Sequence, residues 1–303
     1  MDAMAVTEGF LAAAVRVATP LLLAATGETV AQRSGVMNLG LEGVMLTGAL
    51  AAAVGAATWG PWAGAGSAVL AGMLLAGVFA LVVIGARADQ VIAGTAITLG
   101  AVGLTGTIYR LAFGATGAGL DLPTLAPLPV PGLSKLPVIG AAFFGQPAPT
   151  YLSLLAVPVV WWFLFRTKTG LALRATGEAA SVARASGVRT RVVRAAATLA
   201  GGAFGGLAGA TLVLAQVGTF AERMTAGRGY VAIAIVVLGR WHPVGVALAS
   251  LGFGAAMALQ FLFQTLGLDV PYQLFLMLPY ALALLALAGV VGRVKAPADL
   301  GKS

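Results

Sequence analysis

Long apolar runs, separated by short polar breaks, follow one another along almost the whole chain. Eight of these runs predict membrane-crossing helices, at residues 8–30, 38–58, 62–85, 90–112, 150–166, 194–216, 243–266 and 272–292. Several runs carry at most one charged side chain, and about 20 apolar residues suffice for a helix to cross a hydrocarbon core about 30 Å thick. The pattern therefore predicts a polytopic transmembrane helical bundle.

A shorter apolar piece occupies 229–239, between Arg228 and Arg240. It is too short to cross a bilayer upright unless its helix begins upstream, near Met224. The sequence accordingly predicts nine membrane segments, or eight and a re-entrant one.

Composition agrees with this pattern. The 303 residues are 59% hydrophobic and 9% charged, whereas an average soluble chain is about 25% charged. We interpret residues 1–303 as a single all-α membrane domain. The chain contains no cysteine and a single histidine, His242, which leaves no thiolate or histidine-rich metal site to expect.

The cations predict the orientation, because Lys and Arg accumulate in short loops on the cytoplasmic side. With the N-terminus outside and the C-terminus inside, the inner side receives Arg33, Arg87, Arg166, Lys168, Arg174, Arg184, Arg189, Arg191, Arg194, Arg240, Arg293, Lys295 and Lys302. The outer side receives Arg110, Lys135, Arg223 and Arg228. The net charge of +8 thus comes from the ends of spans and not from one exposed face, so no nucleic-acid partner is expected.

The predicted outer segment, residues 113–149, is rich in proline and glycine and carries only Asp121 and Lys135 as charged residues. Proline at this density prevents a continuous helix, so the segment should be a turn-rich cap. Two functions are open for it. It is either a docking or gating surface for an external partner, or a connector packed over the helix ends.

The predicted inner segment, residues 167–193, concentrates arginine. Thr176 can cap a helix whose first turn holds Glu178, and Gly187 can terminate that helix. Its body consists of small residues such as Ala183, so a groove on another protein could accept it closely. The alternative is a basic loop that only anchors the inner face.

The sequence TGLALRATGEAASVARASGV at 169–188 resembles the cytoplasmic coupling segment of ABC importer permeases, in the branch that handles ribose-type sugars, nucleosides and branched-chain amino acids. In that family an Arg-Ala-x-Gly-Glu run precedes a short helix that enters a cleft on the ATPase and ends at a glycine. Ala179 and Ala180 stand where relatives often have Asn-Pro. The resemblance implies an ATPase-coupling set of Arg174, Gly177, Glu178, Ala183 and Gly187.

Three further stretches are similar to the nucleoside-type permeases of this family: GETVAQRSGVMNLGLEGVMLTGA at 27–49, MTAGRGYVAIAIVVLGRWHPVGV at 224–246 and the ending LPYALALLALAGVVGRVKAPADLGKS at 278–303. The resemblance implies a multi-pass subunit of the bacterial plasma (inner) membrane. Its implied partners are a second related permease, an ATPase subunit and an external substrate-binding lipoprotein. The implied substrates are nucleosides, with purine nucleosides expected and a ribose-like sugar or branched-chain amino acid as the alternative. ATP and Mg²⁺ would bind the partner ATPase, and this chain would bind no cofactor.

Glu28 and Glu42 lie in apolar runs, where an ionisable group costs about 2.5–3.5 kcal/mol. The polar stretch between them contains glycines, and we interpret 27–43 as a break between two helices beside the translocation path or its cytoplasmic gate. Glu42 and Asn38 are therefore candidate path residues. The alternative is an ordinary cytoplasmic turn in which Arg33 pairs with a carboxylate.

Neutral polar side chains form a second candidate set. Thr95, Thr98 and Tyr109 lie on the fourth run, and Gln260 and Gln264 share a helix face on a later run. Hydroxyls and amides suit an uncharged ligand such as a nucleoside, because no charge has to be desolvated. The alternative is hydrogen bonding between helices.

No phosphate-binding loop of the form Gly-x-x-x-x-Gly-Lys-Ser/Thr is present, and no catalytic cluster is recognisable. We therefore expect a transport subunit that is not itself an enzyme and that takes its energy from a separate ATPase. A secondary transporter, which needs no ATPase, is the remaining alternative.

Overall fold

The computed structural model describes residues 3–114, 121–265, 277, 281 and 295–302. This part of the chain is all-α, and its single β-type pairing is an isolated bridge between Pro127 and Pro147. The all-α fold class is confirmed.

Six helical stretches of the described chain are long and apolar enough to cross a membrane. They are α1 (Ala3–Arg33), α2 (Leu41–Trp59), α3 (Pro61–Ala80) continued by the π-helical η1 (Leu81–Gly85), α4 (Gln90–Phe113), α6 (Ala148–Arg166), and α9 (Thr190–Thr211) continued by η3 (Leu212–Val217). Two further apolar helices are α10 (Arg228–Leu238) and α11 (Pro243–Thr265). Seven of the predicted runs match helices with ends displaced by at most about five residues. The run at 272–292 falls outside the described residues, apart from Met277 and Ala281.

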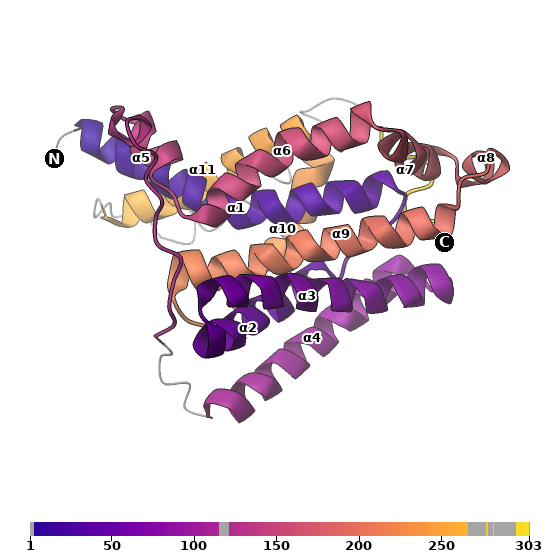
Figure 1. Cartoon of the computed structure of the whole chain (residues 1–303), viewed down its shortest axis with the longest axis horizontal. Coiled ribbons are helices and arrows are strands. Elements are labelled where there is room, and N and C mark those ends of the chain that lie inside the picture. Colours follow the sequence, from indigo (N-terminus) through magenta and orange to yellow (C-terminus); the bar gives the residue numbers. More distant parts are fainter. Residues whose placement is uncertain (1–2, 115–120, 266–276, 278–280, 282–294, 303) are drawn as a thin grey trace.

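Helix α9 lies in the middle of the bundle and packs against α1, α2 and α3 (Figure 1). Its glycines make this approach possible. A Cβ atom on Gly206 would collide with the Ala68 carbonyl of α3, and one on Gly209 would collide with the Met45 carbonyl of α2. Small residues at helix contacts allow backbones to approach closely in a membrane, where the hydrophobic effect contributes little between helices. The small-residue stripe therefore places α9 as the central packing element.

The short apolar piece forms α10, which is preceded by an irregular stretch at 218–221 and turns at 222–227. Its 11 residues extend about 16 Å at 1.5 Å per residue, roughly half of a hydrocarbon core. It begins beside Glu42 in α2, and Trp241, just beyond its end, lies beside Gln32 in α1. The helix does not begin upstream near Met224, because residues 222–227 are turns. The condition for an upright crossing by this segment is therefore not met.

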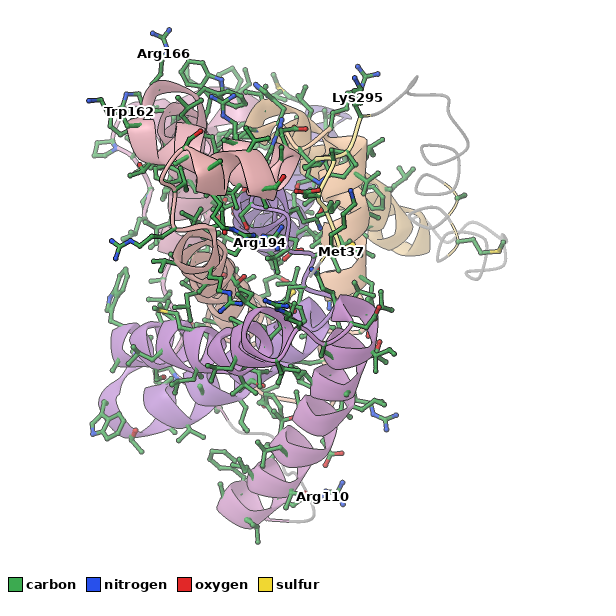
Figure 2. The ribbon with its side chains drawn as sticks, turned by 90° about the vertical axis from the view of Figure 1, so that its right-hand side faces the viewer. Met37, Arg110, Trp162, Arg166, Arg194 and Lys295 are labelled. Carbon is green, nitrogen blue, oxygen red and sulfur yellow. The ribbon has the colours of Figure 1, made fainter. Side chains whose placement is uncertain are left out.

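One end of the bundle carries α7 (Lys168–Glu178), α8 (Ala180–Ala185), the loop at 34–40, the start of α9 and the described tail at 295–302. We call it the basic end, because it gathers Arg33, Arg87, Arg174, Arg184, Arg191 and Arg194. Figure 1 places α7, α8 and the C-terminus opposite α5 (Ile139–Phe144) and the N-terminus. Figure 2 looks onto the basic end and shows Arg194 and Met37 near its middle. Which end faces the cytoplasm stays a prediction.

The proline-rich segment packs over the helix ends opposite the basic end. Its backbone donates hydrogen bonds from Leu122 to the Gly218 carbonyl at 3.0 Å and from Leu125 to the Leu214 carbonyl at 2.7 Å. Both leucine side chains are buried. The segment also contains the short helices η2 (Leu133–Lys135) and α5. It is therefore a packed connector, and a docking role for it stays a prediction.

Candidate functional site

Helix α7 turns sharply away from the end of α6. The Thr167 side chain accepts a hydrogen bond from the Gly170 N–H at 3.0 Å, which satisfies one of the free donors of the first turn. Arg174 then ties α7 back to α6, since its Nε donates to the Leu164 carbonyl at 2.9 Å and its guanidinium lies 4.9 Å from the centre of the Phe165 ring. Arg174 thus fixes the angle between the two helices and is only partly accessible.

The predicted start of the coupling helix at Thr176 is wrong. Thr176 is buried inside α7, and its hydroxyl donates to the Ala172 carbonyl at 2.8 Å. The helix has already begun at Lys168, because Thr167 caps it there. The chain breaks at Ala179, where φ is −155° and ψ is 85°, and α8 begins at Ala180.

The predicted end of the helix at Gly187 is confirmed. Gly187 has a φ of +86°, a conformation that glycine adopts at little cost. Its N–H donates to the Arg184 carbonyl, and the Val188 N–H donates to the Ala183 carbonyl, each at 3.0 Å. These two bonds form a Schellman motif. The coupling helix therefore has a fixed end.

The start of α8 is capped by the C-terminal tail. The Asp299 carboxylate accepts a hydrogen bond from the Ala180 N–H at 2.7 Å, and the Asp299 N–H donates to the Gly177 carbonyl at 2.9 Å. The hydrogen bond from Ala180 holds the pKa of Asp299 below its usual range, and Lys302 adds to this effect. The tail thus joins α7 and α8 at the point where the helix is broken.

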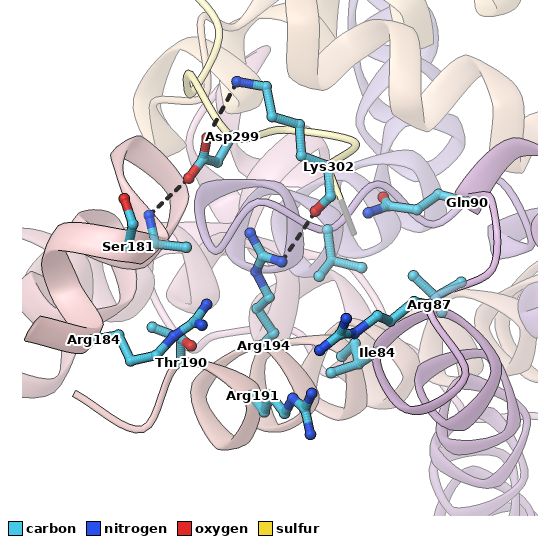
Figure 3. Close-up of a pocket in the computed structure, with 13 residues that line it drawn as sticks. Ile84, Arg87, Gln90, Ser181, Arg184, Thr190, Arg191, Arg194, Asp299 and Lys302 are labelled. Atoms are coloured by element: carbon cyan, nitrogen blue, oxygen red, sulfur yellow. Dashed lines mark hydrogen bonds and ion pairs between the residues drawn. The ribbon is translucent and has the colours of Figure 1, made fainter. Parts of the chain in front are cut away.

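The same tail reaches the loop between α1 and α2. The Gly301 N–H donates to the Gly35 carbonyl at 3.1 Å. Arg194 of α9 donates from its Nη1 to the Lys302 carbonyl at 3.0 Å (Figure 3). Its Nε donates to the Ser34 carbonyl at 3.3 Å. Residues 299–302 therefore connect the coupling helices to the break between α1 and α2 and to the central helix α9.

The residues of the predicted coupling set have different environments. Glu178 and Gly187 are exposed, whereas Gly177 and Ala183 are buried. The backbone of Gly177 lies against the end of α1, and a Cβ atom there would collide with the Arg33 carbonyl. The exposed members lie near an open groove of about 440 Å³ between α7 and α8, whose lining includes Leu171, Glu178 and Val182. Glu178 and Val182 thus belong to a surface that a partner can reach, while Gly177 and Ala183 hold that surface in position.

The predicted break within 27–43 is confirmed but is shorter than expected: residues 34–40 interrupt the helices, whereas 27–33 and 41–43 are helical. A buried polar network surrounds this break. Glu28 Oε1 accepts hydrogen bonds from Gln32 Nε2 and from the Asn38 N–H, both at 2.9 Å. The Gln32 Oε1 in turn accepts from the Trp241 indole at 2.7 Å. Arg33 donates to the Trp241 carbonyl at 2.8 Å. The alternative interpretation, a turn in which Arg33 forms an ion pair with a carboxylate, is not found in the described part of the chain. Asn38 therefore belongs to a helix break that is fixed by hydrogen bonds to α1 and, through Gln32 and Arg33, to Trp241 beyond the end of α10.

The Glu42 side chain accepts hydrogen bonds from the start of the short helix α10 and from the turn before it. Its Oε1 accepts from the Thr225 hydroxyl at 2.6 Å and from the Gly227 N–H at 2.8 Å, and its Oε2 accepts from the Gly229 N–H at 2.6 Å. The free N–H groups of a helix start carry partial positive charge and favour a carboxylate. The sequence drew attention to Glu42 but did not reveal these partners, because turn residues in an apolar chain carry no periodic signal.

Of the other candidate residues for the translocation path, the structure places Thr98 beside the helix break and the rest elsewhere or outside the described side chains. Thr98 is buried beside the same break, and its hydroxyl lies 3.5 Å from the Leu39 carbonyl. Tyr109 is buried and packs against Phe113 and Phe220. Thr95 is exposed on α4 and donates to the Val91 carbonyl at 2.8 Å. The side chains of Gln260 and Gln264, in the last turns of α11, lie outside the described residues.

Among the described residues, no group of His, Asp and Glu side chains could hold a metal ion. The long apolar helices, the short apolar helix α10 and the protruding α7–α8 pair define a polytopic all-α membrane protein (Figure 1).

Comparison with known sequences gives the family. Residues 10–287 match the family described as "Branched-chain amino acid transport system / permease component", and the chain belongs to this family. It is 35% identical over 309 residues to the guanosine ABC transporter permease protein NupQ of Bacillus subtilis, with 98% of this chain and 96% of the relative covered. The nucleoside ABC transporter permease protein NupC of Lactococcus lactis is 33% identical, with 92% and 91% covered. TsgC13 of Haloferax volcanii, named provisionally as a glucose ABC transporter permease, is 42% identical, with 88% and 80% covered. The chain is therefore a multi-pass transport subunit and not itself an enzyme.

Proposed function

We propose that this chain is the permease subunit of an ABC importer in the bacterial plasma membrane and that it translocates nucleosides, with purine nucleosides as the preferred class. Support for the substrate comes from the relatives that carry nucleoside and guanosine permease names and align over more than nine tenths of this chain.

The observation that carries the proposal is the geometry of α7 and α8. Two short helices protrude from the basic end, and the second is fixed at its start by Asp299 and at its end by Gly187. A helix held at both ends transmits displacement as a rigid unit. We place this end in the cytoplasm, where a separate ATPase subunit would bind ATP and Mg²⁺ and grip α8 beside Glu178 and Val182.

Closure of the ATPase would then move α8, and the tail would carry that movement to the break at 34–40 and to α9. The helices on either side of this break would rock and open the path to the opposite side, as in other alternating-access transporters. A second related permease would complete the path, and an external substrate-binding lipoprotein would deliver the substrate to the end that carries α5.

The translocation path would run beside Asn38, Glu42 and Thr98. Glu42 serves there as the fixed acceptor for the start of α10, and its hydrogen bonds already occupy both carboxylate oxygens. Direct contacts to a nucleoside would come from neutral groups, including Thr95 on the exposed face of α4. Such groups exchange hydrogen bonds with water without a charge-desolvation cost.

A sugar is the second candidate substrate, favoured by the 42% identity to the provisionally named glucose permease. Cells that lack this chain, complemented with the wild-type gene, should regain uptake of radiolabelled guanosine. Restoration of labelled glucose or leucine uptake, with guanosine uptake unchanged, would reject the nucleoside assignment. A tagged chain should also co-purify a subunit that hydrolyses ATP, and full uptake without such a subunit would reject the ABC mechanism.

A further inference from the structure

A basic cavity of about 380 Å³ opens at the basic end, next to α8 (Figure 3). Its cationic lining residues are Arg87, Arg184, Arg191, Arg194 and Lys302. They come from four parts of the chain: the connection between η1 and α4, helix α8, the start of α9 and the tail. Their gathering is a property of the fold, since no single stretch of sequence contains them all.

The cavity carries a large excess of positive charge. Among the described lining residues Asp299 is the one acidic group, and its carboxylate is already engaged by Ala180 and Lys302. Within the described residues, the hydrogen bonds of Arg194 go to the backbone carbonyls of Ser34 and Lys302. Arg87, Arg184 and Arg191 are exposed, and the described part of the chain offers none of them a carboxylate within ion-pair distance. Cations held together in this way repel one another unless an anion lies between them.

An apolar groove of about 750 Å³ continues from this cavity along the side of the bundle. It lies between α3 with η1 and the first turns of α9, and its lining includes Leu74, Gly77, Val78, Leu81, Val192 and Leu199. Leu74 and Leu81 are each 73% exposed. Two residues, Ile84 and Arg191, line both the groove and the basic cavity. The two hollows therefore form one site, in which the groove is apolar and the cavity at its end, the mouth of the site, is cationic.

We propose that this site binds an anionic phospholipid, with the phosphate headgroup in the basic cavity and an acyl chain in the groove. The groove lies on helices that span the membrane, and its mouth lies where these helices end, at the level of the headgroups. Clusters of Lys and Arg at this level attract acidic lipids, and apolar surface alongside them accepts acyl chains. Charge complementarity favours this occupant over a zwitterionic lipid, whose headgroup carries no net charge.

A lipid bound here would also contact the coupling machinery. Its phosphate would lie between Arg184 of α8 and Arg191 of α9, and Arg87 would hold it from the α4 side. The inference requires only that the chain spans a membrane, so it does not depend on the substrate or on the ATPase.

The test uses the full-length chain purified in detergent, with native mass spectrometry to count bound lipid after exposure to phosphatidylglycerol or phosphatidylcholine. Wild-type protein should retain phosphatidylglycerol in preference to phosphatidylcholine. Each arginine is worth about 1 kcal/mol toward an acidic lipid, about fivefold in binding. Arg87→Gln with Arg191→Gln should therefore weaken phosphatidylglycerol binding about 25-fold, and Arg166→Gln, an exposed arginine outside the site, should not.

The groove has a matched pair of variants on one helix. Gly77→Leu should reduce lipid retention, because Gly77 lines the groove. Gly66→Leu should not reduce it, because Gly66 is exposed on α3 with open space around it.

Equal retention of phosphatidylglycerol by wild type and the double arginine variant would overturn the proposal. Binding of inorganic phosphate that displaces phosphatidylglycerol, with no effect of Gly77→Leu, would show a free-anion site instead. Efficient cross-linking of a Leu74→Cys chain to a second permease would show that protein covers the groove.

Discussion

The Asp299 carboxylate caps helix α8 by accepting a 2.7 Å hydrogen bond from the Ala180 N–H, across a separation of 119 residues. A helix of six residues has too few internal hydrogen bonds to persist alone. The tail therefore supplies part of the order of the coupling helix, and it also contacts the loop between α1 and α2. In the proposed mechanism, the tail therefore transmits movement of α8 to the loop between α1 and α2.

Asp299→Ala should uncouple transport. Loss of a side-chain cap costs about 0.5–2 kcal/mol of helix stability, enough to loosen a helix of six residues. ATP-driven uptake in proteoliposomes should fall several-fold, while the amount of inserted protein stays at the wild-type level. Lys295→Ala is the control, because Lys295 is an exposed residue of the same tail. Equal loss in both variants would mean that tail charge, and not the cap, matters.

Docking of the tail should depend on pH in a defined direction. The pKa of Asp299 is lowered in the folded protein, chiefly by the hydrogen bond from Ala180. A group with a depressed folded pKa stabilises the fold fully above its unfolded pKa, about 3.9 for Asp, and this contribution is lost as pH falls through the folded value. A dye on a Ser303→Cys variant should therefore report constant anisotropy from pH 7 to about pH 5 and a fall below about pH 4. In Asp299→Asn this acidic transition should disappear, and an unchanged transition would assign it to another group.

Gly177→Ala should disturb the contact between α7 and α1. A Cβ atom at this position would collide with the Arg33 carbonyl, so α7 has to move away from the loop that the tail also contacts. Overpacking of this kind costs about 1–3 kcal/mol, and the thermal midpoint should fall together with ATP-driven uptake. Gly100→Ala is the matched control, because Gly100 is also helical and has open space around it. Wild-type uptake by Gly177→Ala would contradict a close α7–α1 contact.

The exposed surface of α7 and α8 can be tested separately from the buried residues that hold these helices in position. Glu178→Arg places a cation on the exposed surface, and Gly187→Leu forces a side chain into a φ of +86°. Both variants should insert normally, lose co-purification of the ATPase and lose uptake. Leu171→Ala offers a milder change on the neighbouring groove. Normal uptake and normal ATPase recovery in both main variants would move the coupling surface elsewhere.

The apolar runs predict most of the helices because burial in lipid demands uninterrupted hydrogen-bonded backbone, and Gly187 marks a helix end because of its conformational freedom. Thr176 misleads because a threonine inside a helix can bond to its own backbone just as well as it can cap a start. The partners of Glu42 and the cap at Asp299 are not predictable in the same way. They are contacts between distant segments, and neither the turns at 222–227 nor a short polar tail carries a repeating pattern.

Glu42→Gln should weaken both stability and transport. Three donors converge on the Glu42 carboxylate, from Thr225, Gly227 and Gly229, and a glutamine side chain offers one acceptor oxygen in place of two. At least one buried donor then loses its partner, at a cost of about 1–3 kcal/mol. The thermal midpoint should drop, and uptake should fall because the start of α10 is no longer fixed against α2. Glu222→Gln is the control, since its exposed ion pair with Arg110 is worth about 0–1 kcal/mol. Wild-type stability and uptake in Glu42→Gln would show that α10 does not depend on this carboxylate.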